Sequence, residues 1–222
     1  MRRVDVAEWL DDGAHPEEEI EASLRDLARI NRWLGGVATA EWLLQAIARQ
    51  SGMREISVLD VASGRGDVSA RAAAHLRLRG IDVKLTALDH SDQVLRRSEV
   101  KERVVGDALA LPFRDRSFDV VTCCLFAHHL TPEALQRFIR EARRIARAAV
   151  CINDLRRSRA HLVAVCAGLP IFSRITRHDA VASVRRAYTL PEMRTMLHMA
   201  APGARIQMHR RLFFRMGAIV WM

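Results

Sequence analysis

Asp60, Asp89 and Asp107 each stand at or just beyond the end of a short apolar segment. Because the carboxyl ends of parallel strands meet at one edge of a sheet, we expect the three carboxylates to lie near one another. A turn of small residues follows the first of them and lets a ligand approach the backbone closely. These small residues are Ala62, Ser63, Gly64 and Gly66. Since carboxylates bind ribose hydroxyls and cationic groups, the pattern indicates a nucleoside ligand that carries positive charge.

A dinucleotide site uses a similar glycine turn, so the neighbouring residues decide between the two ligands. Asp89 follows Gly66 at about the 20-residue distance at which an acid meets ribose hydroxyls, which suits either ligand. In a dinucleotide site, however, pyrophosphate lies against the start of the helix after the turn. The carboxylate of Asp60 would repel pyrophosphate and attract a cation. The sequence therefore favours a cationic nucleoside over a dinucleotide.

Two adjacent histidines, His128 and His129, directly follow the apolar run at residues 117–126. They are predicted to lie at the same sheet edge as the carboxylates. An imidazole accepts a proton near neutral pH, so either histidine can act as a base for a substrate that must lose a proton. His129 is the first candidate and His128 the second. The alternative is that both only stack on, or hydrogen-bond to, the bound nucleoside.

Strand-like and amphipathic helical segments alternate along the chain, which is typical of an α/β protein. The prediction is a three-layer sandwich around a seven-stranded, mostly parallel, Rossmann-like sheet that ends in a hairpin. Residues 1–50 are expected to form an N-terminal helical cap, broken at Gly35 and Gly36, and residues 51–222 the nucleoside-binding domain. Residues 155–198 form an insertion longer than a helical crossover requires. We expect it to cover the pocket of the acceptor, the substrate that would react with the bound nucleoside.

Four segments, in this order, resemble the class I S-adenosylmethionine-dependent methyltransferases, especially small-molecule enzymes such as the ubiquinone and menaquinone methyltransferases. They are VLDVASGRGD (58–67), TALDHS (86–91), GDALALPFRDRSFDVVTC (106–123) and LFAHHL (125–130). The resemblance covers residues 56–152 closely and the rest of the chain loosely. It implies the methyltransferase fold and S-adenosylmethionine as the cofactor.

The resemblance also implies which residues hold the methionine part of the cofactor. Asp60 and the backbone from Ala62 to Gly66 would bind it, and the backbone near Leu125 would meet its amino group. Arg32, just before the break between the first two helices, is a candidate for its carboxylate; a solvated arginine at a helix end is the alternative. Ala62 stands where the family most often has glycine. We expect it to be tolerated with a negative φ.

The adenosine part would be bound further along the chain. By resemblance, Asp89 would bind both ribose hydroxyls. His90 and the pair Asp107 and Ala108 would flank the adenine.

The implied reaction is methyl transfer to a small, hydroxylated aromatic or polyketide-like acceptor, with O-methylation favoured over C-methylation.

The net charge is +9, and residues 136–222 hold 17 arginines but only four acidic residues, Glu141, Asp154, Asp179 and Glu192. This asymmetry predicts an anionic acceptor, an acidic carrier protein, or RNA. An RNA methyltransferase and a non-catalytic cofactor-binding partner therefore stay open. The single tyrosine and the lack of an appended binding domain make nucleic acid the less favoured partner.

The apolar segments give further expectations. The longest, residues 161–172, is too short to span a bilayer, and the first residues lack an apolar signal core, so we expect a cytoplasmic monomer or homodimer. Cys123, Cys124, Cys151 and Cys166 sit in apolar surroundings without metal-ligand spacing. They are predicted to be buried reduced thiols, and no metal site is expected.

Overall fold

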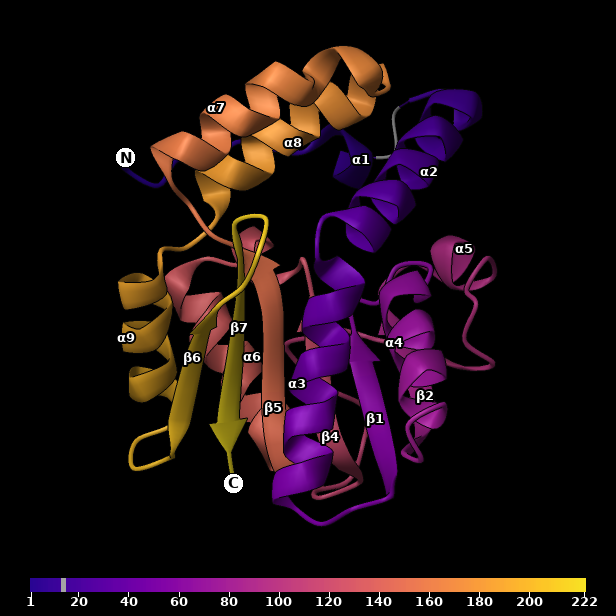
Figure 1. The fold of residues 1–222 in the computed structure, drawn as a ribbon, viewed down its shortest axis with the longest axis vertical. Helices are drawn as coiled ribbons and strands as arrows, with labels where there is room; N and C mark the ends of the chain where they lie inside the picture. Colours follow the sequence, from indigo (N-terminus) through magenta and orange to yellow (C-terminus); the bar gives the residue numbers. More distant parts are fainter. Residues whose placement is uncertain (13–14) are drawn as a thin grey trace.

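The computed structural model describes residues 1–12 and 15–222, and within them a seven-stranded sheet lies between helices (Figure 1). The strands are β1 (Glu55–Val61), β2 (Asp82–Asp89), β3 (Glu102–Val105), β4 (Phe118–Cys124), β5 (Ala146–Leu155), β6 (Ile206–Arg210) and β7 (Arg215–Trp221). Their order is β3-β2-β1-β4-β5-β7-β6. Strands β1 to β5 pair in parallel, and β7 runs antiparallel to β5 and β6. The predicted α/β sandwich with a closing hairpin is confirmed.

The helices cover both faces of the sheet and its upper edge. They are α1 (Trp9–Asp12), α2 (Glu17–Trp33), α3 (Gly36–Gln50), α4 (Asp67–Arg77), α5 (Asp92–Leu95), α6 (Pro132–Ile145), α7 (Arg159–Gly168), α8 (Arg174–Arg186) and α9 (Leu190–Ala200), with short 3-10 turns η1 (Ala127–His129) and η2 (Leu169–Ile171). One apolar core joins the sheet to α3 and α4, and another joins it to α6 and α9. Helices α1, α2, α7 and α8 lie beyond the carboxyl ends of the parallel strands, at the top of Figure 1.

Local sequence explains where several of these elements begin and end. Helix α6 begins after Thr131, whose hydroxyl accepts the Ala134 N–H, as its position before an amphipathic run predicts. Leu135, Phe138 and Ile139 are fully buried on the inner face of α6. Helices α2 and α3 are separated at Gly35, where φ is +81°, a value that favours glycine. The break therefore falls where the glycine pair predicts it.

The cysteines differ in part from the prediction. All four are free, and Cys123 and Cys151 are buried as expected. Burial raises the pKa of both thiols and so disfavours their reactive thiolate form. Cys166 is exposed on α7, so the prediction that it is buried was wrong. The outer face of α7 turns apolar side chains to the surface, and apolar sequence there does not mean burial. Among the described helices, none is long and apolar enough to cross a membrane.

Candidate active site

The turn between β1 and α4 leaves open backbone at the carboxyl edge of the sheet. Gly64 has φ +57°, and among the described residues other than its two chain neighbours no heavy atom lies within 4 Å of the position that a Cβ would take there. Gly66 has φ +67° and is closely packed, because a Cβ there would lie 2.7 Å from Val100 Cγ2. Close packing thus requires glycine at position 66, whereas Gly64 leaves room for a ligand.

Ala62 departs from the expectation. Its φ is +53°, in the left-handed region, so the negative φ on which the expected tolerance of alanine depends is not met. That conformation costs a non-glycine residue about 1–2 kcal/mol. The neighbouring Ser63 N–H donates to the Leu88 carbonyl at 3.0 Å and holds the turn against β2. The strain at Ala62 is therefore borne by contacts that fix the turn at the end of β1.

Asp89 joins the end of β2 to this turn. Its Oδ2 accepts the Gly64 N–H at 2.9 Å, and its Oδ1 accepts the Ser91 N–H at 3.1 Å. The residue is 7% exposed, and the exposed His90 ring lies 3.2 Å from Oδ1. A carboxylate has about four acceptor positions, so one fixed by two backbone donors can still accept hydroxyl groups.

Asp60 is a buried carboxyl with one unsatisfied oxygen. Oδ2 accepts the Ser69 hydroxyl at 2.6 Å, whereas Oδ1 is buried without a hydrogen-bond partner in the described part of the chain. Burial raises the pKa of Asp60 to about 7, and the charges of Asp67 and Asp89 add to this rise. An unpaired buried oxygen costs about 1–3 kcal/mol, so a ligand cation at Oδ1 would be stabilising.

The other predicted cofactor residues occupy varied positions. Asp107 Oδ1 accepts the Leu109 N–H at 2.8 Å in the exposed loop after β3, next to Ala108. Leu125, with φ +55° at the end of β4, donates its N–H to the Asn153 carbonyl at 2.8 Å. The exposed Arg32 guanidinium lies 5.0 Å from the centre of the Trp33 ring. The contact that the structure gives Arg32 is therefore with Trp33 and not with the turn at residues 62–66.

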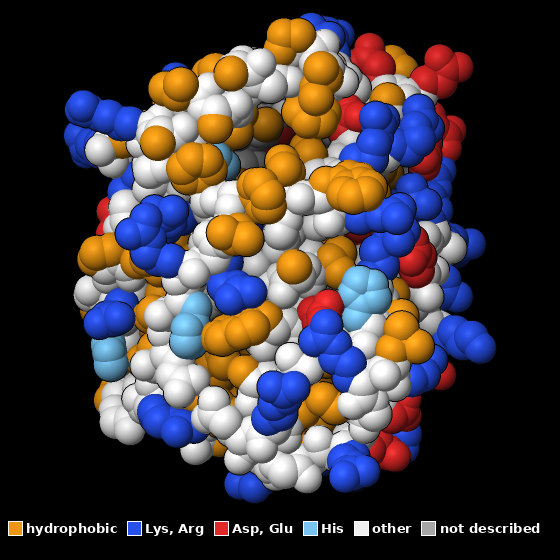
Figure 2. All heavy atoms as spheres, viewed as in Figure 1, with side chains coloured by type: hydrophobic (Ala, Val, Ile, Leu, Met, Phe, Trp, Pro, Cys, Tyr) orange, Lys and Arg blue, Asp and Glu red, His pale blue; other side chains and the backbone are white. Residues whose placement is uncertain are grey.

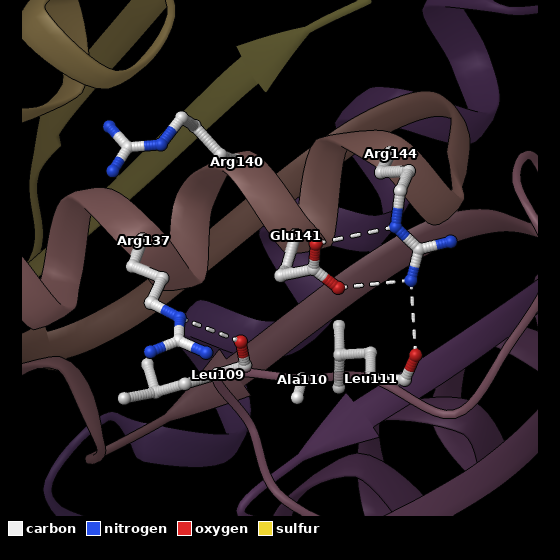
Figure 3. Close-up of a pocket in the computed structure, with 7 residues that line it drawn as sticks. All are labelled: Leu109, Ala110, Leu111, Arg137, Arg140, Glu141 and Arg144. Carbon is white, nitrogen blue, oxygen red and sulfur yellow. Dashed lines mark hydrogen bonds and ion pairs between the residues drawn. The ribbon is translucent and has the colours of Figure 1, made fainter.

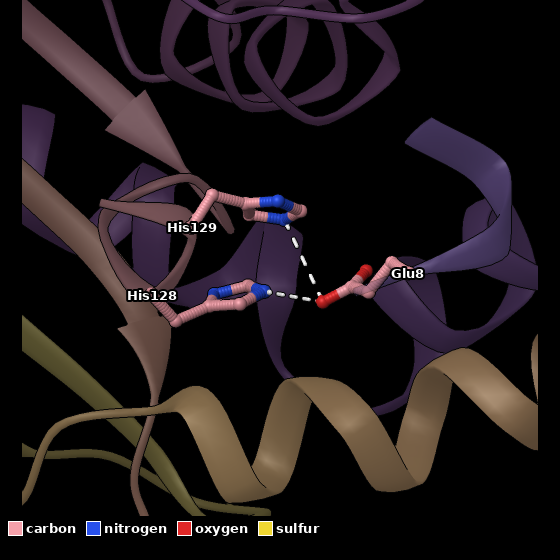
Figure 4. Close-up of side chains that lie close together, drawn as sticks. All are labelled: Glu8, His128 and His129. Atoms are coloured by element: carbon pink, nitrogen blue, oxygen red, sulfur yellow. Dashed lines mark ion pairs between the residues drawn. The ribbon is translucent and has the colours of Figure 1, made fainter. Parts of the chain in front are cut away.

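The two histidines meet an acid from the start of the chain (Figure 4). Glu8 Oε1 lies 3.4 Å from His128 Nε2 and 3.8 Å from His129 Nε2. On its other side, His128 Nδ1 lies 2.7 Å from Asp154 Oδ1, and its backbone N–H donates to Asp154 Oδ2 at 2.9 Å. The Ser183 hydroxyl donates to Glu8 Oε1 at 2.8 Å. Two carboxylates therefore face one buried imidazole.

This environment bears on the predicted role of His128 as a base. Burial opposes a charge on the ring, but Asp154 and Glu8 outweigh it and raise the pKa of His128 to about 9. The ring therefore holds a proton at neutral pH, which speaks against His128 as a proton acceptor. The side chain of His129 is 21% exposed and lies beside it.

A cavity of about 540 Å³ lies above the histidines, enclosed by α2, α7, α8 and the loop between β6 and β7. His128, His129 and Leu125 line it at the end of β4. Most of its walls are apolar, and they include Leu27, Ile30, Val165, Phe172, Phe213 and Phe214. Hydrophobic side chains also gather around a hollow in the upper part of the surface (Figure 2). Such a cavity suits a small apolar ligand with few polar groups.

Known proteins share sequence motifs with this chain. The family described as "Methyltransferase domain" matches residues 58–149. A demethylmenaquinone methyltransferase of Thermotoga maritima is 33% identical over 119 residues, which are 52% of this chain and 50% of that protein. The ubiquinone/menaquinone biosynthesis C-methyltransferase UbiE of Rickettsia bellii is 32% identical over 99 residues, which are 40% of this chain and 39% of that protein.

Solved structures share the fold. The plantazolicin methyltransferase BamL, in complex with a triazolic desmethylPZN analog and SAH, has a TM-score of 0.71 at 16% identity, covering 94% of this chain and 92% of BamL. A SAM dependent methyltransferase from Aquifex aeolicus has a TM-score of 0.57 at 17% identity, covering 80% and 88%. Residues 58–149 of this chain match the methyltransferase domain family, and the whole fold is that of solved S-adenosylmethionine-dependent methyltransferases.

The chain spans half or less of the length of the two curated relatives. The family match at residues 58–149 runs from β1 into β5. It therefore includes the turn, Asp89 and both histidines. The cavity walls from α2, α7, α8 and the β6–β7 loop lie outside it. The predicted boundaries of the cap, residues 1–50, and of the insertion, residues 155–198, remain predictions.

Three residues of the candidate site were not predicted from the sequence. Arg215 is 1% exposed, lines the cavity and donates from Nη2 to Asn31 Oδ1 at 2.9 Å. Its Nη1 has no hydrogen-bond partner among the described residues. Asp154 and Glu8 are the other two. Arg215 and Asp154 each stand at the end of an apolar strand segment, a signal that could have been noticed, whereas Glu8 has no comparable local signal.

Two arginines of the basic C-terminal third make contacts that support the fold. In the shallow groove of Figure 3, Arg137 Nε donates to the Leu109 carbonyl at 3.1 Å. Arg144 pairs with Glu141 at 2.9 Å and donates to the Leu111 carbonyl at 3.0 Å. These contacts hold the segment after β3 against α6. Part of the positive charge is therefore used within the fold, which weakens the inference of an anionic partner.

Proposed function

We propose that this chain transfers a methyl group from S-adenosylmethionine to a small, largely apolar, hydroxylated acceptor, with O-methylation favoured over C-methylation. The observation that carries the proposal is the cavity of about 540 Å³ whose lining includes Leu125, His128 and His129 at the carboxyl end of β4. Strand β4 is the direct neighbour of β1, whose turn we assign to the cofactor. The quinone methyltransferases among the relatives and the natural-product methyltransferase among the structural neighbours support a small-molecule acceptor.

The residues at the turn fit the cofactor. Asp60 Oδ1 is buried and unsatisfied among the described residues, and a cationic amino group would satisfy it. The open backbone at Gly64 leaves room for a ligand. We propose that the turn from Ala62 to Gly66, through Ser63, and the backbone near Leu125 hold the methionine part.

The adenosine part and the carboxylate complete the assignment. We propose that Asp89 binds the ribose hydroxyls and that His90, Asp107 and Ala108 flank the adenine. For the carboxylate of the cofactor's methionine part, the sequence predicts Arg32. The buried Arg215, however, has a donor without a hydrogen-bond partner among the described residues, and it lines the cavity. Arg215 is therefore the better-supported candidate.

When bound, the cofactor supplies a methyl group on a cationic sulfur, already activated for transfer. The protein must place the acceptor in line with that group and exclude water. The apolar walls of the cavity exclude water, and they are contributed largely by α2, α7 and α8. We propose that His129, which lines the cavity, accepts the proton that the acceptor hydroxyl loses on methylation, and that the protonated His128 beside it orients that hydroxyl. The enclosed shape of the cavity favours a small molecule over RNA.

Narrowing the cavity tests this proposal. Ala180 of α8 lines it, so Ala180→Phe is expected to lower turnover by about 100-fold, because a misplaced acceptor loses alignment. Binding of the demethylated cofactor should not change. Turnover is measured with labelled methyl donor and a panel of phenols and enolisable aromatic ketones, and binding by calorimetry. Any turnover by the wild type excludes a purely non-catalytic role.

The matched control is Ala167→Phe, an exposed alanine of α7 that is not among the cavity-lining residues. It should retain turnover. If Ala180→Phe keeps wild-type turnover on every accepted substrate, the cavity is not the acceptor site. If the wild type methylates mixed RNA but none of the small molecules, the RNA alternative replaces the proposal.

The Asp60 carboxyl predicts a pH dependence of cofactor binding. Its pKa of about 7 means that it is largely protonated below pH 7, and a cationic ligand must then displace that proton. The affinity for demethylated cofactor should fall about tenfold for each pH unit below 7 and level off above it. Calorimetry between about pH 5.5 and 8.5 measures this. Asp60→Asn should bind more weakly and lose the slope; an identical slope in that variant would assign it to another group.

A further inference from the structure

Within the described part of the chain, Glu8, His128 and His129 could hold a metal ion together. One ligand atom from each lies within 4.8 Å of the other two. Glu8 comes from the segment before α1 and the histidines come from η1, and all three side chains point toward a common centre (Figure 4). Two imidazoles and one carboxylate form one of the donor sets of catalytic zinc sites.

The distances from Glu8 Oε1 to the two imidazoles are close to those between ligands of a shared cation. Ligand atoms bound to one Zn²⁺ at about 2.0–2.2 Å in a tetrahedron lie about 3.3–3.6 Å from one another. Glu8 Oε1 lies 3.4 Å from His128 Nε2 and 3.8 Å from His129 Nε2. The side-chain exposure of Glu8 is 9% and that of His128 is 3%. Small movements would bring the three atoms to ligand distances.

The groups behind these side chains support the same interpretation. Metal-bound histidines usually donate their second ring nitrogen to a carboxylate, which fixes the ring. Asp154 Oδ1 lies 2.7 Å from His128 Nδ1 in this arrangement, and Ser183 holds Glu8 by a hydrogen bond of 2.8 Å. This leaves His128 Nε2, which is buried without a hydrogen-bond partner among the described residues, directed at the cluster. Such an atom is one that a ligand would satisfy.

We propose that Glu8, His128 and His129 bind a divalent transition-metal ion, best matched by Zn²⁺, at the floor of the acceptor cavity. All three residues line that cavity, so the remaining coordination position faces it. A hydroxyl or enol oxygen of the acceptor is suited to that position, where the dication would favour its deprotonated form. This last step rests on the proposed function, but binding of the metal does not. With the metal bound, the two histidines would act as ligands and His129 would not be the proton acceptor.

A cluster of ion pairs is the competing explanation. Arg186 Nη1 lies 3.9 Å from Glu8 Oε1, so the acid has cationic neighbours without a metal. Glu8 Oε1 lies 3.4 Å from one ring nitrogen of His128, and Asp154 Oδ1 lies 2.7 Å from the other. Two carboxylates so close to the cluster would attract a dication more strongly than a single positive charge. Direct binding measurements separate the two explanations.

The test is titration of chelator-treated protein with ZnCl₂ by calorimetry, and with Co²⁺ followed by its visible absorption. The wild type is expected to bind one ion at a site whose affinity falls at least about tenfold in Glu8→Gln and in His129→Ala. The control is Glu41→Gln, which alters an exposed contact with His75 at 2.9 Å and should keep wild-type affinity. Circular dichroism checks that each variant is folded.

Two results overturn the inference: no Zn²⁺ binding by the wild type, or equal affinity in the wild type and both site variants. The fate of the proposed function is read separately. Methyl transfer that survives chelation, together with absent metal binding, would reject the metal site and keep the function. Metal binding without methyl transfer to any acceptor of the panel would keep the metal site and reject the proposed function.

Discussion

Asp89→Ala is expected to weaken binding of the demethylated cofactor by about 100-fold or more. The carboxylate would accept two ribose hydroxyls, and each hydrogen bond to a charged group contributes about 1.5–3 kcal/mol. Since about 1.4 kcal/mol corresponds to a tenfold change, two such bonds account for this loss. The substitution also removes the acceptors of the Gly64 and Ser91 N–H groups, so the turn itself loses support. Calorimetric titration measures the dissociation constant.

Two variants separate ligand contact from folding. Asp82→Ala lies at the opposite end of β2, where the acid contacts the exposed Arg77, and should bind the cofactor as the wild type does. Asp89→Asn keeps an oxygen acceptor for Gly64 but loses the charge, so it should fall between wild type and Asp89→Ala. Equal affinities for wild type and Asp89→Ala would show that Asp89 does not bind the ribose.

The parts of the fold set by short-range sequence were predictable. Asp60 and Asp89 stand at or next to the ends of β1 and β2 because apolar runs stop there, and the following glycines require turns. Thr131 begins α6 because its hydroxyl supplies an acceptor for the first free N–H groups. Each of these signals lies within a few residues of its effect. The order of strands then follows from the family pattern that these motifs match.

The parts set by long-range packing were not predictable. Glu8 meets His128 across 120 positions of the chain, and no local pattern indicates that contact. Arg215 reaches Asn31 because β7 inserts beside β5, which brings the start of β7 close to the last turn of α2. The positive φ of Ala62 is likewise imposed by its surroundings, since alanine itself prefers a negative value. Contacts of this kind require the three-dimensional arrangement.

The donor set of the proposed metal site illustrates the same limit. The sequence predicts no metal site, because the four cysteines lack metal-ligand spacing. In the structure, two ligands are adjacent in sequence, at His128 and His129, but the third arrives from the segment before α1. A pair of adjacent histidines is too common a pattern to indicate a metal. The carboxylate that completes the set is visible only after folding.

Asp154→Ala is expected to lower the free energy of unfolding by about 3–5 kcal/mol, because it breaks a buried charged pair. Asp154 is 1% exposed and accepts the backbone N–H groups of His128 and Leu155 as well as contacting the His128 ring. The attraction to His128 holds the pKa of Asp154 below its usual range despite burial, which raises it. Removing the acid leaves an imidazole and two N–H groups without their acceptor. Urea denaturation followed by circular dichroism measures the change.

Asp115→Ala provides the comparison that makes this result specific to burial. Asp115 also pairs with a cation, Arg144 at 2.8 Å, but its side chain is 74% exposed. Exposed pairs contribute about 0–1 kcal/mol, since water and salt screen them. The two aspartates should therefore differ severalfold in their effect on stability. A loss at Asp154 no larger than that at Asp115 would mean that His128 is held by its other neighbours, and that Asp154 neither anchors η1 nor orients the ring toward Glu8.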